Sequence, residues 1–127
     1  MKYIIPDIPP SNNKYIGRNA RFEYQAMKKH WAELIWCFCI PRPIAPINKS
    51  VVKIKYYFPD KRRRDPDNYS GKMILDGLRT ANIITDDSFS NITLLLSAEF
   101  GCDCKGTEIE VIEDEMPEVQ CKSKDSK

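Results

Sequence analysis

The sequence lacks any long run of hydrophobic residues. The longest candidate, residues 34–40, follows a charged segment and is far shorter than the roughly 18–20 residues that cross a bilayer. The N-terminus also lacks the basic-then-apolar pattern and the small-residue cleavage site of a secretion signal. We therefore expect a cytoplasmic protein that has no membrane partner.

Internal repeats are absent as well, and the length leaves little room for a second independent core. The chain has 127 residues, of which 42% are hydrophobic and 30% are charged. This profile is typical of a soluble globular protein and excludes a disordered one. We expect residues 1–113 to form one domain and residues 114–127 to form a polar, frayed C-terminal tail.

A disulfide framework is not supported, because the number of cysteines is odd and no secretion signal precedes them. The five cysteines are Cys37, Cys39, Cys102, Cys104 and Cys121. Their two Cys-x-Cys pairs suggest a four-thiolate zinc site, but the usual spacing has two to four intervening residues. The alternative, which we favour, is that they are reduced thiols that serve as small buried hydrophobic residues.

The small net charge of +2 hides a strong asymmetry between the two halves of the chain. Residues 1–64 carry 14 Lys or Arg and 4 Asp or Glu, whereas residues 65–127 carry 6 and 14. The first half therefore has a net charge of +10 and the second half −8. The basic half suggests a polyanionic partner, and the acidic half suggests either a metal site or a solvated acidic edge.

Hydrophobic periodicity predicts the regular elements. Apolar residues at spacings of three and four predict two helices. The first has Asn19 as its N-cap and runs to about Phe38, and the second runs from about Tyr69 to Ala81. The apolar stripe of the first helix consists of Tyr24, Met27, Trp31, Leu34, Ile35 and Phe38. Alternation of apolar and polar residues predicts strands at 50–58, 91–100 and 107–112, the last two joined by a hairpin at 101–106. Residues 2–8 are expected to form an edge strand, because Pro6 interrupts them. The order β-α-β-α-β-β predicts an α+β fold, a small mixed sheet with two helices packed on it.

Three aspartates occupy loops that a strand–helix–strand unit can bring near one sheet. Asp65 and Asp67 lie between a strand and a helix, and Asp87 lies in the loop after that helix. Both loops can approach an edge of the sheet, though not necessarily the same one. Converging carboxylates would repel one another without a cation and would suit Mg²⁺ or Mn²⁺. Alternatively, Asp-Pro-Asp-Asn is ordinary turn and N-cap chemistry.

A basic run directly before Asp65 favours the metal interpretation. It consists of Lys61, Arg62, Arg63 and Arg64. Arg and Lys bind phosphates, and a metal that hydrolyses a phosphodiester needs a phosphate brought to it. The same run could instead be a solvated loop.

Lys72 also has two interpretations. It lies four residues before Asp76, so the pair could be a simple i,i+4 ion pair on the helix surface. Because Lys72 lies near the helix start, where the Asp65–Asp67 loop ends, it could instead stabilise charge that develops on a scissile phosphate. We favour the second interpretation and regard Asp76, like Asp86 beside Asp87, as a possible secondary residue of the site.

Several motifs in order resemble the RusA family of Holliday junction resolvases, from Pro9 to about Ile112. They are Pro-Pro-Ser-Asn-Asn-Lys-Tyr at 9–15, Phe-Pro-Asp-Lys-Arg-Arg-Arg-Asp-Pro-Asp-Asn at 58–68, Lys72, Asp-Gly-Leu at 76–78 and Ile-Thr-Asp-Asp at 84–87. One departure is the spacing: the family has two residues between Asn68 and the lysine, and this chain has three. Counted back from Asp76, Lys72 has the expected spacing, so we interpret Gly71 or a neighbour as an insertion.

The resemblance implies which residues act. Asp65, Asp67 and Asp87 would bind the metal and act as the catalytic carboxylates, with Lys72 as an essential lysine. DNA contacts would come from Ser11, Asn12, Asn13, Lys14, Lys61, Arg62, Arg63, Arg64, Asn68 and Lys72.

The resemblance also implies an activity, because the family consists of small, homodimeric, Mg²⁺-dependent endodeoxyribonucleases that are often carried by prophages. The expected function is paired symmetric nicking of four-way DNA junctions in recombination and repair, with Mn²⁺ able to replace Mg²⁺. The alternatives are an inactive protein that binds branched DNA, a less selective nuclease for flaps or forks, and a dimeric scaffold.

Overall fold

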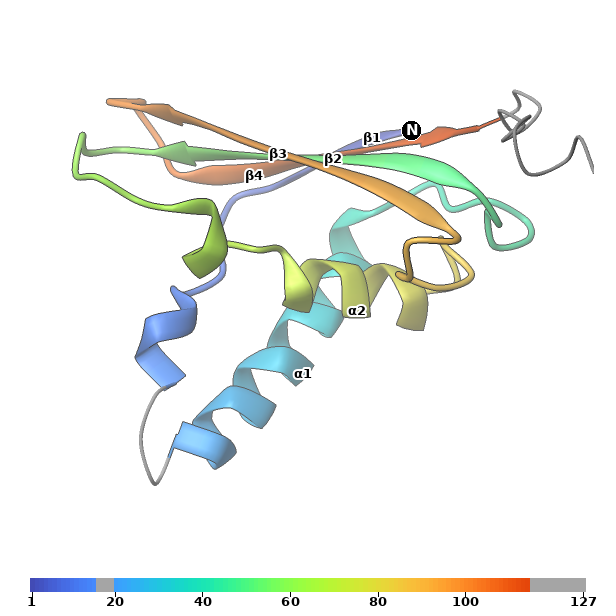
Figure 1. Cartoon of the computed structure of the whole chain (residues 1–127), viewed down its shortest axis with the longest axis horizontal. Coiled ribbons are helices and arrows are strands. Elements are labelled where there is room, and N and C mark those ends of the chain that lie inside the picture. Colours follow the sequence, from blue (N-terminus) through green and yellow to red (C-terminus); the bar gives the residue numbers. More distant parts are fainter. Residues whose placement is uncertain (16–19, 115–127) are drawn as a thin grey trace, which may run out of the picture.

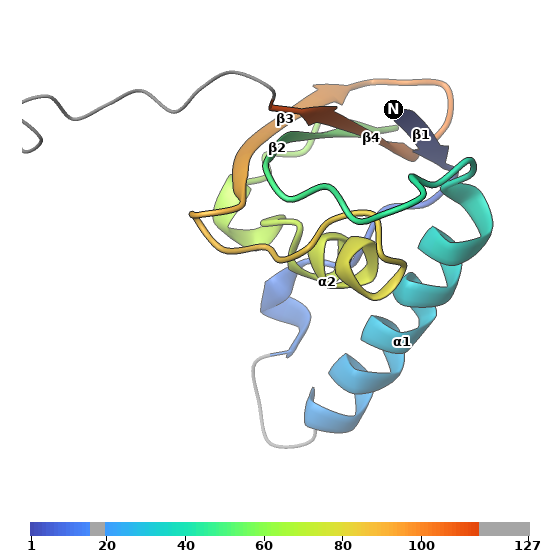
Figure 2. The same ribbon diagram turned by 90° about the vertical axis from the view of Figure 1, so that its right-hand side faces the viewer.

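The computed structural model describes residues 1–15 and 20–114 and consists of a four-stranded sheet with two α-helices on one face (Figures 1 and 2). The strands are β1 (Lys2–Ile5), β2 (Ser50–Phe58), β3 (Ile92–Phe100) and β4 (Gly106–Glu113). The helices are α1 (Ala20–Phe38) and α2 (Lys72–Thr80), and two 3₁₀ turns, η1 (Asn12–Tyr15) and η2 (Pro66–Asn68), precede them. The predicted α+β class is confirmed.

The sheet has the strand order β1-β4-β2-β3. β4 pairs antiparallel with both β1 and β2, whereas β2 and β3 run parallel, in register from Ser50↔Ile92 to Phe58↔Phe100. A parallel pair needs a crossover connection, and α2 provides it. The other face of the sheet carries no helix among the described residues (Figure 1).

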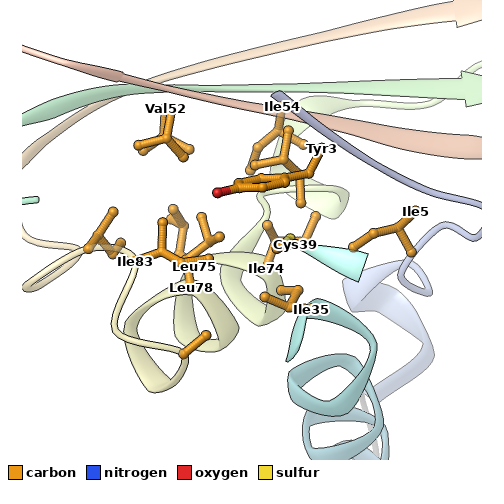
Figure 3. Packing of buried hydrophobic residues seen from close by; sticks show 14 of the residues in the cluster. Tyr3, Ile5, Ile35, Cys39, Val52, Ile54, Ile74, Leu75, Leu78 and Ile83 are labelled. Carbon is orange, nitrogen blue, oxygen red and sulfur yellow. The ribbon is translucent and has the colours of Figure 1, made fainter. Parts of the chain in front are cut away.

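The core lies between the sheet and the helices (Figure 3). Alternate residues of β2 point into it, as the sequence pattern predicts, and so does the apolar side of α2. Gly77 of α2 lets α1 approach closely, because a Cβ there would lie 2.5 Å from Ile35 Cδ1. The predicted apolar stripe of α1 is confirmed at Trp31 and Ile35, which are buried, but Phe38 at its end is exposed.

The boundaries of two elements differ from the predictions by more than one residue, for local backbone reasons. The N-terminal strand ends at Ile5 rather than Ile8, because Pro6 has no amide hydrogen for the ladder. The second helix spans Lys72–Thr80 instead of 69–81. It starts later because its N-cap, Gly71, has φ 82°, a left-handed conformation that lies outside the helix. Asn19, the predicted cap of the first helix, lies outside the described residues.

The cysteines only partly follow the prediction that they are buried. Cys39 is buried, Cys102 is partly buried, and Cys37 and Cys104 are exposed; Cys121 lies outside the described residues. No three His, Cys, Asp or Glu side chains within 1–15 and 20–114 are grouped so that they could hold a metal ion. In that same part of the chain, no helix combines the length and apolar character that a membrane span requires.

Candidate functional site

The two segments expected to contact DNA lie side by side, although more than 50 residues separate them in sequence. The side-chain amide of Asn12 in η1 donates hydrogen bonds to the carbonyl of Asp67, at 2.9 Å, and to the hydroxyl of Ser70, at 3.3 Å. The amide of Lys14 donates to the carbonyl of Ser11 and closes the η1 turn. The side chain of Asn13 lies outside what the structure describes. The Asn12 contacts thus fasten η1 onto the turn that carries Asp65 and Asp67.

The Asp65–Asn68 turn is a short 3₁₀ turn that presents its carboxylates to solvent. Pro66 fixes the first turn position, and the Asn68 amide donates to the Asp65 carbonyl at 3.0 Å. The Asp65 side chain is about half exposed and accepts a hydrogen bond from Nε of Arg63 at 3.2 Å. Asp67 is exposed. The turn that the sequence offered as an alternative is therefore present, but its N-cap, Asp65, makes no side-chain cap hydrogen bond. Both carboxylates stay accessible.

A polar hollow of about 210 Å³ opens between Ser11, which precedes η1, the basic run and this turn. Its lining residues are Ser11, Arg62, Arg63, Arg64, Asp65, Asn68 and Tyr69. Hydroxyl, amide and guanidinium groups are the donors that proteins use to bind phosphate oxygens. The hollow therefore has the chemistry of a site for a backbone phosphate, with one carboxylate at its margin.

The four cations of the basic run are not equivalent. Arg64 is only 11% exposed in its side chain, donates to both carboxylate oxygens of Asp60, at 2.8 and 3.2 Å, and lies 4.1 Å from the ring centre of Phe58. The hydrogen bond from Arg64, followed by one from the Arg62 amide, lowers the pKa of Asp60 to about 2. Arg64 therefore has a structural role, and the structure does not favour the expectation that it grips DNA.

The remaining cations of the run are free to reach a ligand. Lys61, Arg62 and Arg63 are exposed, and the Arg63 side chain is 88% exposed even though it pairs with Asp65. Lys72, the first residue of α2, is also exposed, and it follows directly on the Asp65–Gly71 segment. Of these, Arg62 and Arg63 line the hollow and form its cationic rim, whereas Lys61 and Lys72 are exposed cations on the flanking segments.

The ion pair between Lys72 and Asp76, the alternative interpretation of Lys72, does not form. Asp76 is buried, and its carboxylate instead lies 3.6 Å from Nζ of Lys28 on α1 and 3.8 Å from the guanidinium of Arg79. The same guanidinium lies 3.7 Å from Asp86. Asp76 thus helps hold α1, α2 and the following loop together, and Lys72 stays available to solvent.

Asp87 lies apart from Asp65 and Asp67 within one chain. Because β2 and β3 are parallel, the loop after β2 and the loop before β3 lie at opposite ends of α2 (Figure 1). A helix of nine residues spans about 13 Å, whereas a carboxylate oxygen binds Mg²⁺ at about 2 Å. The described residues accordingly contain no metal-type group of three carboxylates. The fold of one chain does not bring Asp87 to the Asp65–Asp67 turn, and the metal-binding role of the three aspartates stays a prediction.

The Asp86–Asp87 loop has its own local order. Oδ1 of Asp86 accepts a hydrogen bond from the backbone amide of Asp87 at 2.8 Å, and Arg79 draws the Asp86 carboxylate toward α2. Both carboxylates are partly exposed. This loop therefore presents a second, separate acidic position at the far end of the helix.

An aromatic hollow that was not predicted from the sequence lies beside the polar one. Tyr56, Phe58, Tyr69 and Phe100 line it, and the ring centres of Phe58 and Phe100 are stacked 5.5 Å apart. Burial raises the pKa of the Tyr56 hydroxyl, for which the described residues provide no hydrogen-bond partner. The aromatic residues at alternate positions 56 and 58 were the only trace of this hollow in the sequence.

Comparison with protein-family models gives no match for this chain, and comparison with curated proteins gives none either. The likeness to the RusA family therefore rests on the motifs of the sequence.

Proposed function

We propose that the protein is a Mg²⁺-dependent, structure-specific endodeoxyribonuclease that resolves four-way DNA junctions by paired nicks in recombination and repair. The observation that carries this proposal is the contact of the Asn12 amide with Asp67 and Ser70. It joins the two segments through which the RusA resemblance implies DNA contact, and a polar hollow with exposed cations lies where they meet.

The exposed cations support a backbone-directed mode of DNA binding. Exposed Lys61, Arg62, Arg63 and Lys72 can neutralise phosphates, and binding of this kind weakens steeply as salt rises. Phosphate contacts position a protein on DNA but carry no sequence information. Selectivity for branched DNA would accordingly come from the shape of the junction and its deformability.

The proposed metal chemistry needs more than one chain. Asp65 and Asp67 provide two accessible carboxylates on one turn, and Asp87 of the same chain lies at the other end of α2. A three-carboxylate site therefore requires Asp87 of a second copy, in the homodimer that the resemblance implies. Bound Mg²⁺ or Mn²⁺ would supply Lewis-acid stabilisation of a phosphoryl oxygen.

The test is cleavage of a synthetic four-way junction with and without Mg²⁺, with the products mapped on all four strands. Replacement of Asp67 by Asn should slow cleavage by more than about 100-fold, since even outer-shell partners of a metal commonly contribute 10–100-fold, and should leave junction binding intact. The matched control is Asp103→Asn, the same change on the exposed β3–β4 hairpin. Native cleavage by Asp67→Asn would overturn the metal assignment.

The same assay separates the alternative functions. Symmetric cuts in two opposed strands support the resolvase, and equal cutting of flaps and forks supports the less selective nuclease. Junction binding that never leads to cleavage at any Mg²⁺ concentration supports an inactive DNA-binding protein. No binding to any DNA overturns the proposal altogether.

A further inference from the structure

The aromatic hollow and the polar hollow adjoin each other, because Arg64, Asp65 and Tyr69 line both of them. Three arginines and one carboxylate line the polar hollow, and that carboxylate, Asp65, already pairs with Arg63 at 3.2 Å. The polar side therefore keeps an excess of positive charge and suits an anion, whereas the aromatic side suits a flat apolar group. A nucleotide carries these two groups together.

The aromatic hollow lies at the end of the sheet that α2 does not cover (Figure 1). On the helix side of β3, Ile92 at the start of the strand is buried, whereas Phe100 at its end is 42% exposed. The residue of β2 that pairs with Phe100, Phe58, is only 3% exposed. The hollow thus has a buried ring of β2 at its floor and an exposed ring of β3 at its edge.

Aromatic rings arranged in this way can bind a nucleobase by stacking. Unpaired bases stack on Phe and Tyr side chains with little regard to sequence, because every base has a π-face. Tyr69 stands edge-on to Phe58, with ring centres 5.2 Å apart, and Phe100 stacks on Phe58 at 5.5 Å. The exposed part of the Phe100 ring therefore remains available to a base.

The size of the aromatic hollow and the burial of its polar atoms limit what it can bind. Its volume is about 90 Å³, less than the cavity of about 150 Å³ that holds one benzene ring, so it takes part of one six-membered ring and not a two-ring purine. The Tyr56 hydroxyl and Nε of Arg64 have no hydrogen-bond partner among the described residues, but both atoms lie beneath the surface. Recognition therefore depends on stacking and on the size of the base.

We propose that the two hollows form one site for a single unpaired pyrimidine nucleotide, with its phosphate in the polar hollow and its base in the aromatic hollow. A paired base is excluded, because it is held within the stack of the duplex. The inference rests on the proposed function for the source of this nucleotide, which is a strand of branched DNA. Bases that are already unpaired cost least to unstack.

The first experiment titrates the full chain with thymidine monophosphate, deoxyadenosine monophosphate and inorganic phosphate, and follows the backbone amide signals by NMR. Thymidine monophosphate should shift the signals of Ala98 and Phe100 beside the aromatic hollow and of Arg63 beside the polar one, whereas phosphate should shift only the last. The purine nucleotide should bind at least about 5-fold more weakly, because its second ring does not fit. Identical shifts with thymidine monophosphate and phosphate, or equal affinity for the two nucleotides, would overturn the inference.

Two substitutions on β3 provide a matched pair for this titration. Ala98 lines the aromatic hollow and pairs with Tyr56, so Ala98→Phe fills the hollow and should weaken thymidine monophosphate binding by at least about 10-fold, through loss of the stacked base. Thr93→Phe, on the open face of the same strand, should alter the affinity by less than about 2-fold. Equal effects of the two substitutions would contradict the site.

A third variant keeps the inference testable if Ala98→Phe unfolds, which thermal melts would detect. Phe100→Leu removes the exposed ring and keeps an apolar side chain at the edge of the hollow. It should weaken thymidine monophosphate binding by at least about 5-fold and leave the affinity for inorganic phosphate unchanged. Native affinity for the nucleotide in this variant would contradict binding by stacking.

The second experiment tests whether the nucleotide belongs to a DNA strand. A four-way junction with one unpaired thymine at its crossover is compared with the same junction lacking that base, without Mg²⁺ so that binding alone is measured. The native protein should bind the thymine form at least about 5-fold more tightly, which is the contribution of one stacked base, and Ala98→Phe should remove the difference. Equal affinity of the native protein for the two junctions would overturn the assignment to DNA.

The inference and the proposed function fail separately. A protein that binds the unpaired base but never cuts a junction with Mg²⁺ contradicts the proposed function alone. A protein that makes paired cuts but binds thymidine monophosphate no better than inorganic phosphate contradicts the inference alone.

Discussion

The two ends of α2 present opposite chemistry. At its start lie the Asp65–Asn68 turn, the exposed Lys72 and the polar hollow with its basic rim. At its end lie the partly exposed carboxylates of Asp86 and Asp87, with Arg79 between Asp86 and the buried Asp76. Each end holds part of the residue set that the resemblance implies, and neither end is complete. Under the function proposed above, the two ends would have to be combined from two copies of the chain.

The largest expected effect comes from mixing two inactive variants, each altered at one end of α2. Asp67→Asn and Asp87→Asn should each slow junction cleavage by more than about 100-fold, for the reason given above. If each site combines the two ends from different copies, a mixed dimer contains one intact site. The mixture should then regain nicking of one strand, measured on an end-labelled junction.

The control for this mixture joins two variants altered at the same end. Asp65→Asn with Asp67→Asn leaves no intact site in any mixed dimer and should regain nothing. Failure of the Asp67→Asn and Asp87→Asn mixture to regain nicking, while both variants still dimerise and bind DNA, would contradict a site shared between copies.

A smaller effect is expected at the start of α2, where Gly71 sets the position of Lys72. Gly71 has φ 82°, and a Cβ there would lie 2.8 Å from Ile54 Cδ1. Gly71→Ala should therefore reduce the free energy of unfolding by about 1–3 kcal/mol, from backbone strain and crowding. Denaturant titration measures this change.

Gly106→Ala is the matched control for that measurement. A Cβ at Gly106 meets only the Ile5 carbonyl oxygen, at an ordinary contact distance of 3.5 Å. Its free energy of unfolding should change by less than about 1 kcal/mol. Equal losses at the two glycines would refute the special conformation of Gly71, and with it our interpretation of the inserted residue.

The sequence predicted local structure better than it predicted the assembly of the site. Strand 50–58 was predicted with the bounds that the structure has, because alternation of burial along a strand is a local property. The separation of Asp87 from Asp65 depends on the parallel direction of β2 and β3, which no local pattern encodes. The sequence alone therefore left open which end of the sheet each loop reaches.

The basic run shows a second limit of the sequence. Four consecutive cations look equivalent in the sequence, yet the fold buries Arg64 against Phe58 and Asp60 and leaves Arg63 in solvent. Arg64 is buried because of where β2 ends and because it pairs with Asp60. Both depend on the tertiary structure and not on the local sequence. Phosphate binding by the basic run is therefore proposed for Lys61, Arg62 and Arg63 and not for Arg64.

The smallest expected effect distinguishes these two arginines directly. Arg64 lowers the pKa of Asp60 to about 2 from its ordinary 3.8, so Arg64→Met should raise that pKa toward 3.8. Arg63→Met should leave it near 2, because Arg63 pairs with Asp65 instead. Carboxyl chemical shifts followed by NMR measure both values. Since the folded-state pKa of Asp60 is the lower one, the Arg64–Asp60 pair stabilises the loop above about pH 4, and its contribution disappears as the pH falls toward 2.

In junction binding the larger effect should come from Arg63 instead. Arg63→Met should reduce the salt dependence of binding by about one phosphate contact, and Arg64→Met should leave it unchanged. Equal effects of the two substitutions in either measurement would contradict the division of the basic run into a structural residue and a phosphate-binding rim.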